Sequence, residues 1–119
     1  MERLKFNDLR IGDCVEYFIE DYGLGWQLCK ITWQDIQRLY EDCDGFNKEH
    51  RAIPLTEDLL LRCKANSIFN NGFTYVITEE NQVEIYTENE SILITYVEYL
   101  HELQNLNHAL LGEDLIIEF

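Results

Sequence analysis

The stretch FTYVITEENQVEIYTENESILIT, residues 73–95, decides the fold of this chain. It holds three runs rich in β-branched and aromatic residues, Phe73–Thr78, Val83–Thr87 and Ile92–Thr95, which are typical of β-strands. Four polar residues separate each run from the next, and links this short join antiparallel neighbours. The stretch therefore predicts an antiparallel meander. Because Glu84 alternates with apolar residues in the middle run, we expect one face of this sheet to meet water.

A second set of β signals precedes the meander. Cys14–Ile19 is β-branched and aromatic, and the two glycines of Glu20–Gly25 suit a turn into a second strand over Trp26–Trp33. We expect an antiparallel hairpin or a small barrel-like sheet here. A third strand is predicted near Ile36–Tyr40, with a helix as the open alternative, and Asp42–Asn47 has the composition of a turn.

Two helices are predicted around the meander. Thr56 can cap a short helix, whose buried side would carry Leu59, Leu60 and Cys63. A longer helix is predicted over Tyr96–Leu111, with Gly112 as its C-terminal cap, and a final strand over Leu115–Phe119. The sequence thus predicts an α+β fold in which the antiparallel sheet packs with one short and one longer helix.

Length and composition are those of a folded globule. The chain has 119 residues, of which 46% are apolar and 13% aromatic, and no linker-like segment marks a boundary, so we expect one domain over residues 1–119. No apolar run approaches the roughly 20 residues of a membrane-spanning helix. Met1–Phe6 lacks the features of a secretory signal, which predicts a cytoplasmic location in a bacterial host cell.

The charge balance stands out. Nine Lys and Arg face 23 Asp and Glu, a net charge of −14, and such a field repels phosphate backbones, so direct DNA or RNA binding is not expected. Two interpretations stay open: the charge keeps the protein soluble, or the carboxylates imitate phosphates and occupy a basic groove of another protein. The second interpretation predicts seven partner-binding residues on the meander and the first turn: Glu79, Glu80, Glu84, Glu88, Glu90, Glu20 and Asp21.

No motif points to catalysis or to a cofactor. The sequence contains no nucleophile elbow and no glycine-rich phosphate loop, so we expect no enzyme. The cysteines have no paired spacing of the kind that zinc sites use, and we interpret them as free thiols that act as small buried hydrophobes: Cys14, Cys29, Cys43 and Cys63.

One helix face combines histidines with carboxylates. Glu98 and His101 have the Glu-x-x-His spacing of di-iron bundles, but such a site needs four long helices, and this chain predicts one. We therefore predict no metal site. The polar residues of this face are expected to be solvated opposite the leucines: Glu98, His101, Glu102, Asn105 and His108.

Three segments resemble a family of small proteins from Bacteroidetes phages and integrated mobile elements. Leu9–Val15 resembles the opening of that family, Ile53–Leu60 its middle motif, and Tyr99–Leu115 its carboxy-terminal signature. The order and spacing of the segments agree across nearly the whole chain. The sequence departs from the family at Asn107-His108, where an aromatic pair is usual, and at Leu111, where a threonine is usual. The resemblance brings no biochemical activity with it.

The resemblance implies an origin in a mobile element, and small acidic proteins of such elements are often inhibitors of host defence. Together with the charge, it leads us to expect a non-enzymatic accessory protein of the anti-CRISPR type. Its partner would be a host or defence protein with a basic groove, such as a CRISPR effector. The alternative is a structural or self-associating module of a phage or mobile element, which would form a homodimer through its sheet edges or its long helix.

Overall fold

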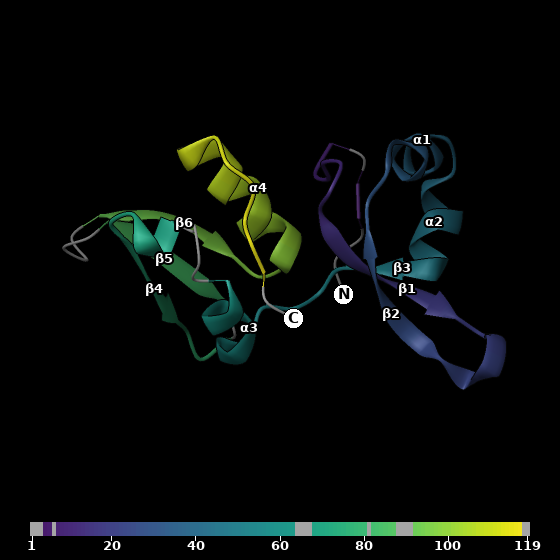
Figure 1. Ribbon diagram of the computed structural model, residues 1–119, viewed down its shortest axis with the longest axis horizontal. Helices are drawn as coiled ribbons and strands as arrows, with labels where there is room; N and C mark the ends of the chain where they lie inside the picture. The colour runs from purple at the N-terminus through teal and green to yellow at the C-terminus, as the bar shows by residue number, and fades with distance from the viewer. Residues whose placement is uncertain (1–3, 6, 64–67, 81, 88–91, 118–119) are drawn as a thin grey trace. The chain divides into compact units, whose positions relative to one another are not determined.

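The computed structural model describes residues 4–5, 7–63, 68–80, 82–87 and 92–117. The chain divides into two compact units, Met1–Ile53 and Pro54–Phe119, each of which holds a three-stranded antiparallel sheet and helices (Figure 1). The predicted α+β class is confirmed, and neither sheet is a closed barrel. The single domain over residues 1–119 stays a prediction, and the two units are taken separately below.

The sheet of the first unit has the order β2-β1-β3. β1 (Cys14–Ile19) pairs with β2 (Gly25–Lys30) along its whole length, and with the short β3 (His50–Arg51) on its other side. The predicted hairpin is therefore confirmed. Its turn contains the 3₁₀ helix η1 (Asp21–Gly23). The prediction that the second strand reaches Trp33 is wrong, because a helix begins there.

The third strand predicted near Ile36–Tyr40 is also wrong, and the helical alternative holds. α1 (Trp33–Glu41) follows a capping box in which the Thr32 hydroxyl accepts from the Asp35 N–H at 3.3 Å. The Asp35 carboxylate accepts from the Thr32 N–H at 2.9 Å in return. These two bonds satisfy backbone donors that a helix start leaves open, so Asp35 belongs to the first helical turn.

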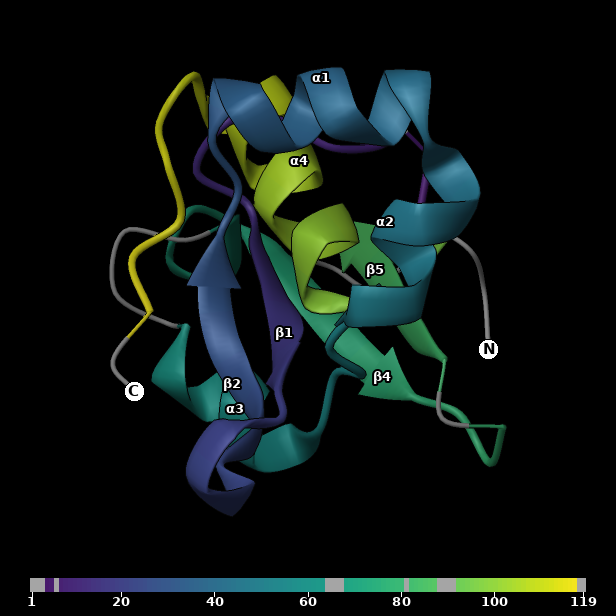
Figure 2. The ribbon, with the colours of Figure 1, turned by 90° about the vertical axis from the view of Figure 1, so that its right-hand side faces the viewer.

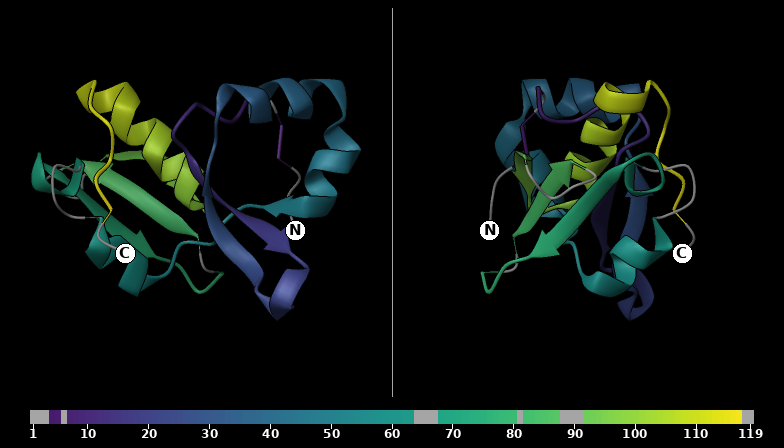
Figure 3. Two further views of the ribbon diagram at one scale, coloured as in Figure 1. Left: turned by 45° about the vertical axis from the view of Figure 1, so that its right-hand side comes forward. Right: turned by 90° about the vertical axis from the view of Figure 1, so that its left-hand side faces the viewer.

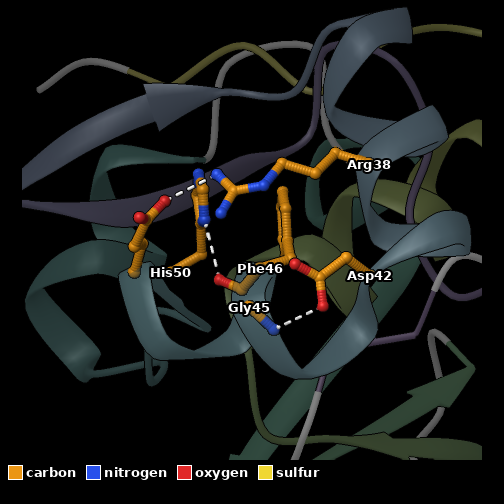
Figure 4. Close-up of polar contacts among 6 residues, drawn as sticks. Arg38, Asp42, Gly45, Phe46 and His50 are labelled. Carbon is orange, nitrogen blue, oxygen red and sulfur yellow. Dashed lines mark hydrogen bonds and ion pairs between the residues drawn. The ribbon is translucent and has the colours of Figure 1, made fainter.

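The segment predicted as a turn at Asp42–Asn47 forms most of a second helix, α2 (Cys43–Glu49). The Asp42 carboxylate caps it by accepting from the Gly45 N–H at 3.1 Å, as Figure 4 shows. A Cβ at Gly45 would collide with that carboxylate, so glycine is what allows the close approach. The Asp-Gly signal thus marks a capped helix start and not a chain reversal.

His50 lies buried where α2 meets β3. Its ring stacks on Phe46 with centroids 3.8 Å apart, and its Nδ1 lies 2.9 Å from the Phe46 carbonyl oxygen (Figure 4). A carbonyl only accepts, so Nδ1 carries the proton of the neutral ring. Burial lowers the pKa of His50, while the Phe46 carbonyl and the carboxylates of Asp35 and Glu49 act in the opposite direction and Arg38 adds to the lowering.

This environment predicts a loss of stability in acid. Since the folded-state pKa of His50 lies below its ordinary value of 6.5, the unfolded chain takes up the proton first as the pH falls through 6.5. The free energy of unfolding should therefore decrease from about pH 7 to about pH 5. His50→Asn keeps an N–H donor without a titrating ring, and should show a shallower decrease in urea titrations. Equal pH dependence in both proteins would contradict the assignment.

The second unit is built on the meander. β4 (Phe73–Ile77), β5 (Val83–Thr87) and β6 (Leu93–Val97) form a sheet of order β4-β5-β6 with antiparallel neighbours, as predicted. The register shifts once, between Ile85 and Tyr86. α4 (Leu100–Leu111) lies across one face of these strands in Figures 1 and 3.

The shorter helices complete this unit. α3 (Glu57–Arg62) is capped as predicted by the Thr56 hydroxyl, which accepts from the Leu59 N–H at 3.2 Å. Leu60 and Cys63 are buried and Leu59 is half-buried. A single 3₁₀ turn, η2 (Ile68–Asn70), leads into β4.

The bounds predicted for the long helix are partly wrong. Gly112 is its C-terminal cap with φ of 71°, as predicted, but the helix begins at Leu100 because Tyr96 belongs to β6. The Glu102 carboxylate caps the start by accepting from the Tyr99 N–H at 3.0 Å. Residues 115–117 form no strand, against prediction, and residues 118–119 lie outside the described ranges. Among the described residues, no helix is long and apolar enough to cross a membrane.

The polar face predicted for α4 is only partly accessible. His101 is buried, against prediction, and the other four residues of that face are half-buried: Glu98, Glu102, Asn105 and His108. Two further polar residues of the helix are also buried, Gln104 and, completely, Asn107. The Asn107 side chain accepts from the Ile68 N–H at 2.8 Å and donates to the Glu113 carbonyl at 3.1 Å. It therefore ties α4 to η2 and to the segment that follows the helix. No group of three or more His, Cys, Asp or Glu within the described ranges is placed to hold a metal ion.

Asn107→Ala should destabilise the second unit. The substitution leaves the buried Ile68 N–H without its acceptor, which costs about 1–3 kcal/mol of unfolding free energy. Urea denaturation measures the effect. Leu110→Ala on the exposed side of the same helix is the control and should change stability by about 0.5 kcal/mol or less. If Asn107→Ala is as stable as the control, the side chain does not hold η2.

Candidate protein-interaction surface

The meander sheet has two unlike faces. Its inner face carries Val83, Ile85 and Val97, which are buried. Alternate residues point to the opposite side, because side chains on a strand alternate at period two. The cross-strand register sets them in two rows on this outer face, one of Val76, Glu84 and Tyr96 and one of Thr74, Tyr86 and Leu93. We call these six residues the outer face.

Half of the outer face is apolar and accessible, whereas Thr74, Glu84 and Tyr86 are half-buried. Tyr96 is 52% exposed, Val76 43% and Leu93 38%, and Ile94, at the shift in register, is 40% exposed. Single exposed apolar side chains are ordinary, but several on neighbouring strands form a patch of the kind that marks interaction sites. Tyrosine is also a preferred anchor residue of protein interfaces.

The structure separates the seven predicted acidic residues. Glu84 is half-buried in the centre of the outer face, and Glu79 and Glu80 are exposed in the turn that joins β4 to β5. Glu20 and Asp21 are exposed at the hairpin turn of the first unit. The remaining two, Glu88 and Glu90, lie outside the described residues. Three of the seven thus lie in the described part of the meander, Glu84 on β5 and Glu79 and Glu80 in the turn before it.

The negative charge is concentrated in the second unit. Residues 54–119 contain two basic and twelve acidic residues, a net charge of −10, whereas residues 1–53 contain seven basic and eleven acidic residues, a net charge of −4. Residues 65–119 hold ten carboxylates and no Lys or Arg at all. The carboxylates on this sheet therefore have no basic side chain in their own part of the sequence.

Two of these carboxylates have internal roles. Glu102 accepts from the backbone N–H groups of Glu98 and Tyr99, each at 3.0 Å, and Glu98 accepts from the Gln82 side chain at 2.9 Å. Both are therefore used to begin α4 and to hold it near β5. Glu79, Glu80 and Glu84 make no ion pair with any other described residue, and Glu79 and Glu80 are exposed while Glu84 is half-buried on the outer face.

The first unit differs, because two of its arginines form ion pairs with carboxylates of the same unit. Arg51 donates to the Glu16 carboxylate at 2.9 Å and lies 4.1 Å from the centroid of the Trp26 ring. Arg38 contacts Glu49 at 2.6 Å, and this hydrogen bond holds the pKa of the Glu49 carboxyl below its usual range (Figure 4). Within this unit, β1 and β2 run side by side in Figure 2. Arg51 and Arg38 thus serve the fold of their own unit.

The four cysteines differ in burial, and burial affects the chemistry of one of them, Cys29. Cys14 and Cys63 are buried, and Cys29 and Cys43 are half-buried, all four as free thiols. Burial raises the pKa of the Cys29 thiol, and the nearby Asp35 acts in the same direction. A raised pKa disfavours the thiolate that nucleophilic chemistry requires.

Sequence reasoning found the carboxylates of this surface but missed its apolar part. Tyr96 was assigned to the long helix, where it could not be placed on the sheet. The signal was present in the alternation of the last strand, because Tyr96 stands one residue before the buried Val97. The same alternation places Val76 of β4 on this face, opposite Glu84 of β5.

Comparisons with protein-family models, with curated proteins and with solved structures give no match to this chain. The likeness to a mobile-element family therefore stays a prediction.

The two faces of the sheet should respond differently to substitution. Ile85→Ala removes a fully buried side chain and should lower the free energy of unfolding by about 2–5 kcal/mol. Tyr96→Thr keeps a strand-forming residue on the accessible face and should change it by less than about 1 kcal/mol. Urea denaturation compares the two variants. An equal loss in both would show that the outer face is packed against other parts of the chain.

Proposed function

We propose that this chain is a non-enzymatic acidic protein that binds a positively charged surface of another protein. One observation carries the proposal: residues 65–119 contain ten carboxylates and no Lys or Arg, and their sheet exposes Glu79, Glu80 and part of Glu84. A field of one sign accelerates encounter with a partner of the opposite sign and rejects partners of the same sign.

The apolar outer face supports a protein as the partner. A surface that only kept the chain soluble would be expected to carry charged residues throughout, whereas here Val76 and Tyr96 flank the central Glu84. An apolar centre beside charged residues is the usual anatomy of a protein interface. Charge steers the encounter, and the apolar contacts hold the complex.

The nature of the partner follows from the charge and from the resemblance. A protein surface that accepts many carboxylates is most often one that binds nucleic acid, because it is lined with Lys and Arg. The mobile-element resemblance would place that partner among host defence proteins, with a CRISPR effector as the leading example. Binding there would block the nucleic acid, and the protein would act as an inhibitor.

Charge reversal in the β4–β5 turn tests this function. The double variant Glu79→Lys and Glu80→Lys should weaken binding to a purified CRISPR effector by about tenfold or more, because each reversal replaces attraction with repulsion. Affinity is measured by interferometry at several salt concentrations, with DNA as competitor. Wild-type binding should weaken as salt rises.

The matched control carries the same change of charge elsewhere. Glu41 and Asp44 are exposed on the helices of the first unit. The double variant Glu41→Lys and Asp44→Lys should keep most of the affinity for the partner. Equal losses of affinity in both double variants would mean that the partner responds to the net charge of the chain and not to the β4–β5 turn. Absence of binding to any basic nucleic-acid-binding protein at low salt would refute the proposed function.

A further inference from the structure

We propose that a basic, extended segment of the partner binds by adding an antiparallel strand to the free edge of β6. The inference rests on the proposed function, because it specifies how a basic partner is held. Strand addition to an exposed sheet edge is a common mode of peptide recognition, in which backbone hydrogen bonds supply affinity and alternate side chains supply specificity.

The first argument is the edge itself. β6 is the last strand of the order β4-β5-β6, and none of the described residues pairs with the other side of Leu93–Val97. Directly beyond the strand, the Leu55 N–H donates to the Glu98 carbonyl at 2.9 Å, so the open edge ends at Val97. Its residues, Leu93–Val97, include no charged residue, proline or glycine. Natural sheets often protect an edge with charged residues or proline, since its open N–H and C=O groups are a template for another chain. An edge without such residues is open to docking along the part whose register is regular.

The second argument is the regularity of part of this edge. The pairing of β6 with β5 is regular from Val97 to Thr95. The register shifts only beyond Thr95. Bulges twist an edge away from further pairing. The incoming strand is therefore assigned to the regular part of β6, next to Tyr96.

The third argument concerns the side chain that the incoming strand would place on the outer face. Neighbouring strands lie about 4.8 Å apart, so a residue opposite Tyr96 would lie about 10 Å from Glu84, measured between Cα atoms. The long arm of a Lys or Arg spans that gap by lying across the exposed Tyr96 ring toward the carboxylate. Ring and carboxylate together select a basic residue at this position.

The charge of the unit argues against a second copy of this chain as the occupant. Two β6 strands that paired with one another would bring together two units of net charge −10. Such like-charge contact is unfavourable. A segment rich in Lys and Arg gains from the same field, so charge complementarity favours the basic partner.

The test uses a labelled peptide of sequence Lys-Val-Arg-Val-Lys-Val-Arg and the full chain. Fluorescence anisotropy should show saturable binding, and hydrogen exchange should slow at the backbone amides of residues 93–97. Tyr96→Leu keeps an apolar side chain without the aromatic ring and should weaken binding by about fivefold. Glu84→Gln should weaken it similarly, whereas Glu113→Gln, at the end of α4, should leave it unchanged.

Two control peptides separate strand addition from plain charge attraction. One carries the same residues in block order, Lys-Lys-Arg-Arg-Val-Val-Val, and the other is methylated on alternate backbone nitrogens. Both should bind clearly more weakly. If all three bind equally and no amide of β6 is protected, strand addition is overturned, although the proposed function stands when the basic protein still binds.

Other outcomes also decide between the proposals. If neither the basic peptides nor basic nucleic-acid-binding proteins bind at low salt, the proposed function and the docking mode fall together. If light scattering shows a stable dimer whose β6 amides are protected without peptide, a second copy occupies the edge and the inference is wrong.

Discussion

The structure of the second unit depends on the alternation of side chains along its three strands. Burying Val83 and Ile85 beneath α4 obliges Glu84, between them, to face the other way. Burial of Val97 has the same consequence for Tyr96. One constraint therefore builds both the core and the outer face, and the register that pairs Glu84 with Tyr96 cannot slip by a residue without exposing the core.

That constraint is also why the meander could be predicted from the sequence. Period-two patterns with short polar links leave few other arrangements, and the predicted strands agree with the observed ones to within a few residues. The region Ile31–Glu49 was harder, because short apolar runs fit a strand or a helix equally well. Local hydrogen bonds decide there: Thr32 with Asp35, and Asp42 with Gly45, begin two helices.

The polar residues of α4 show a different limit of sequence reasoning. Spacing correctly places His101, Gln104 and Asn107 on the helix, but spacing does not say which face meets the sheet. A polar side chain can be buried when its polar atoms form hydrogen bonds. Asn107 bonds to the backbone of Ile68, which is far away in the sequence, and to that of Glu113, which lies beyond the end of α4. Those partners become visible only once the chain is folded, so spacing alone did not identify Asn107 as a buried polar residue that links α4 to η2.

The placement of Glu84 connects the fold to the proposed function. A carboxylate in the open turn, such as Glu79, is fully hydrated and screened by salt, so its attraction to a cation is weak. Glu84 is half-buried between Val76 and Tyr96, where water is partly displaced and an approaching segment would displace more. Attraction between charges strengthens as the local dielectric falls. The exposed carboxylates thus act at a distance and govern encounter, whereas the one among apolar neighbours acts in contact and governs which partner stays bound.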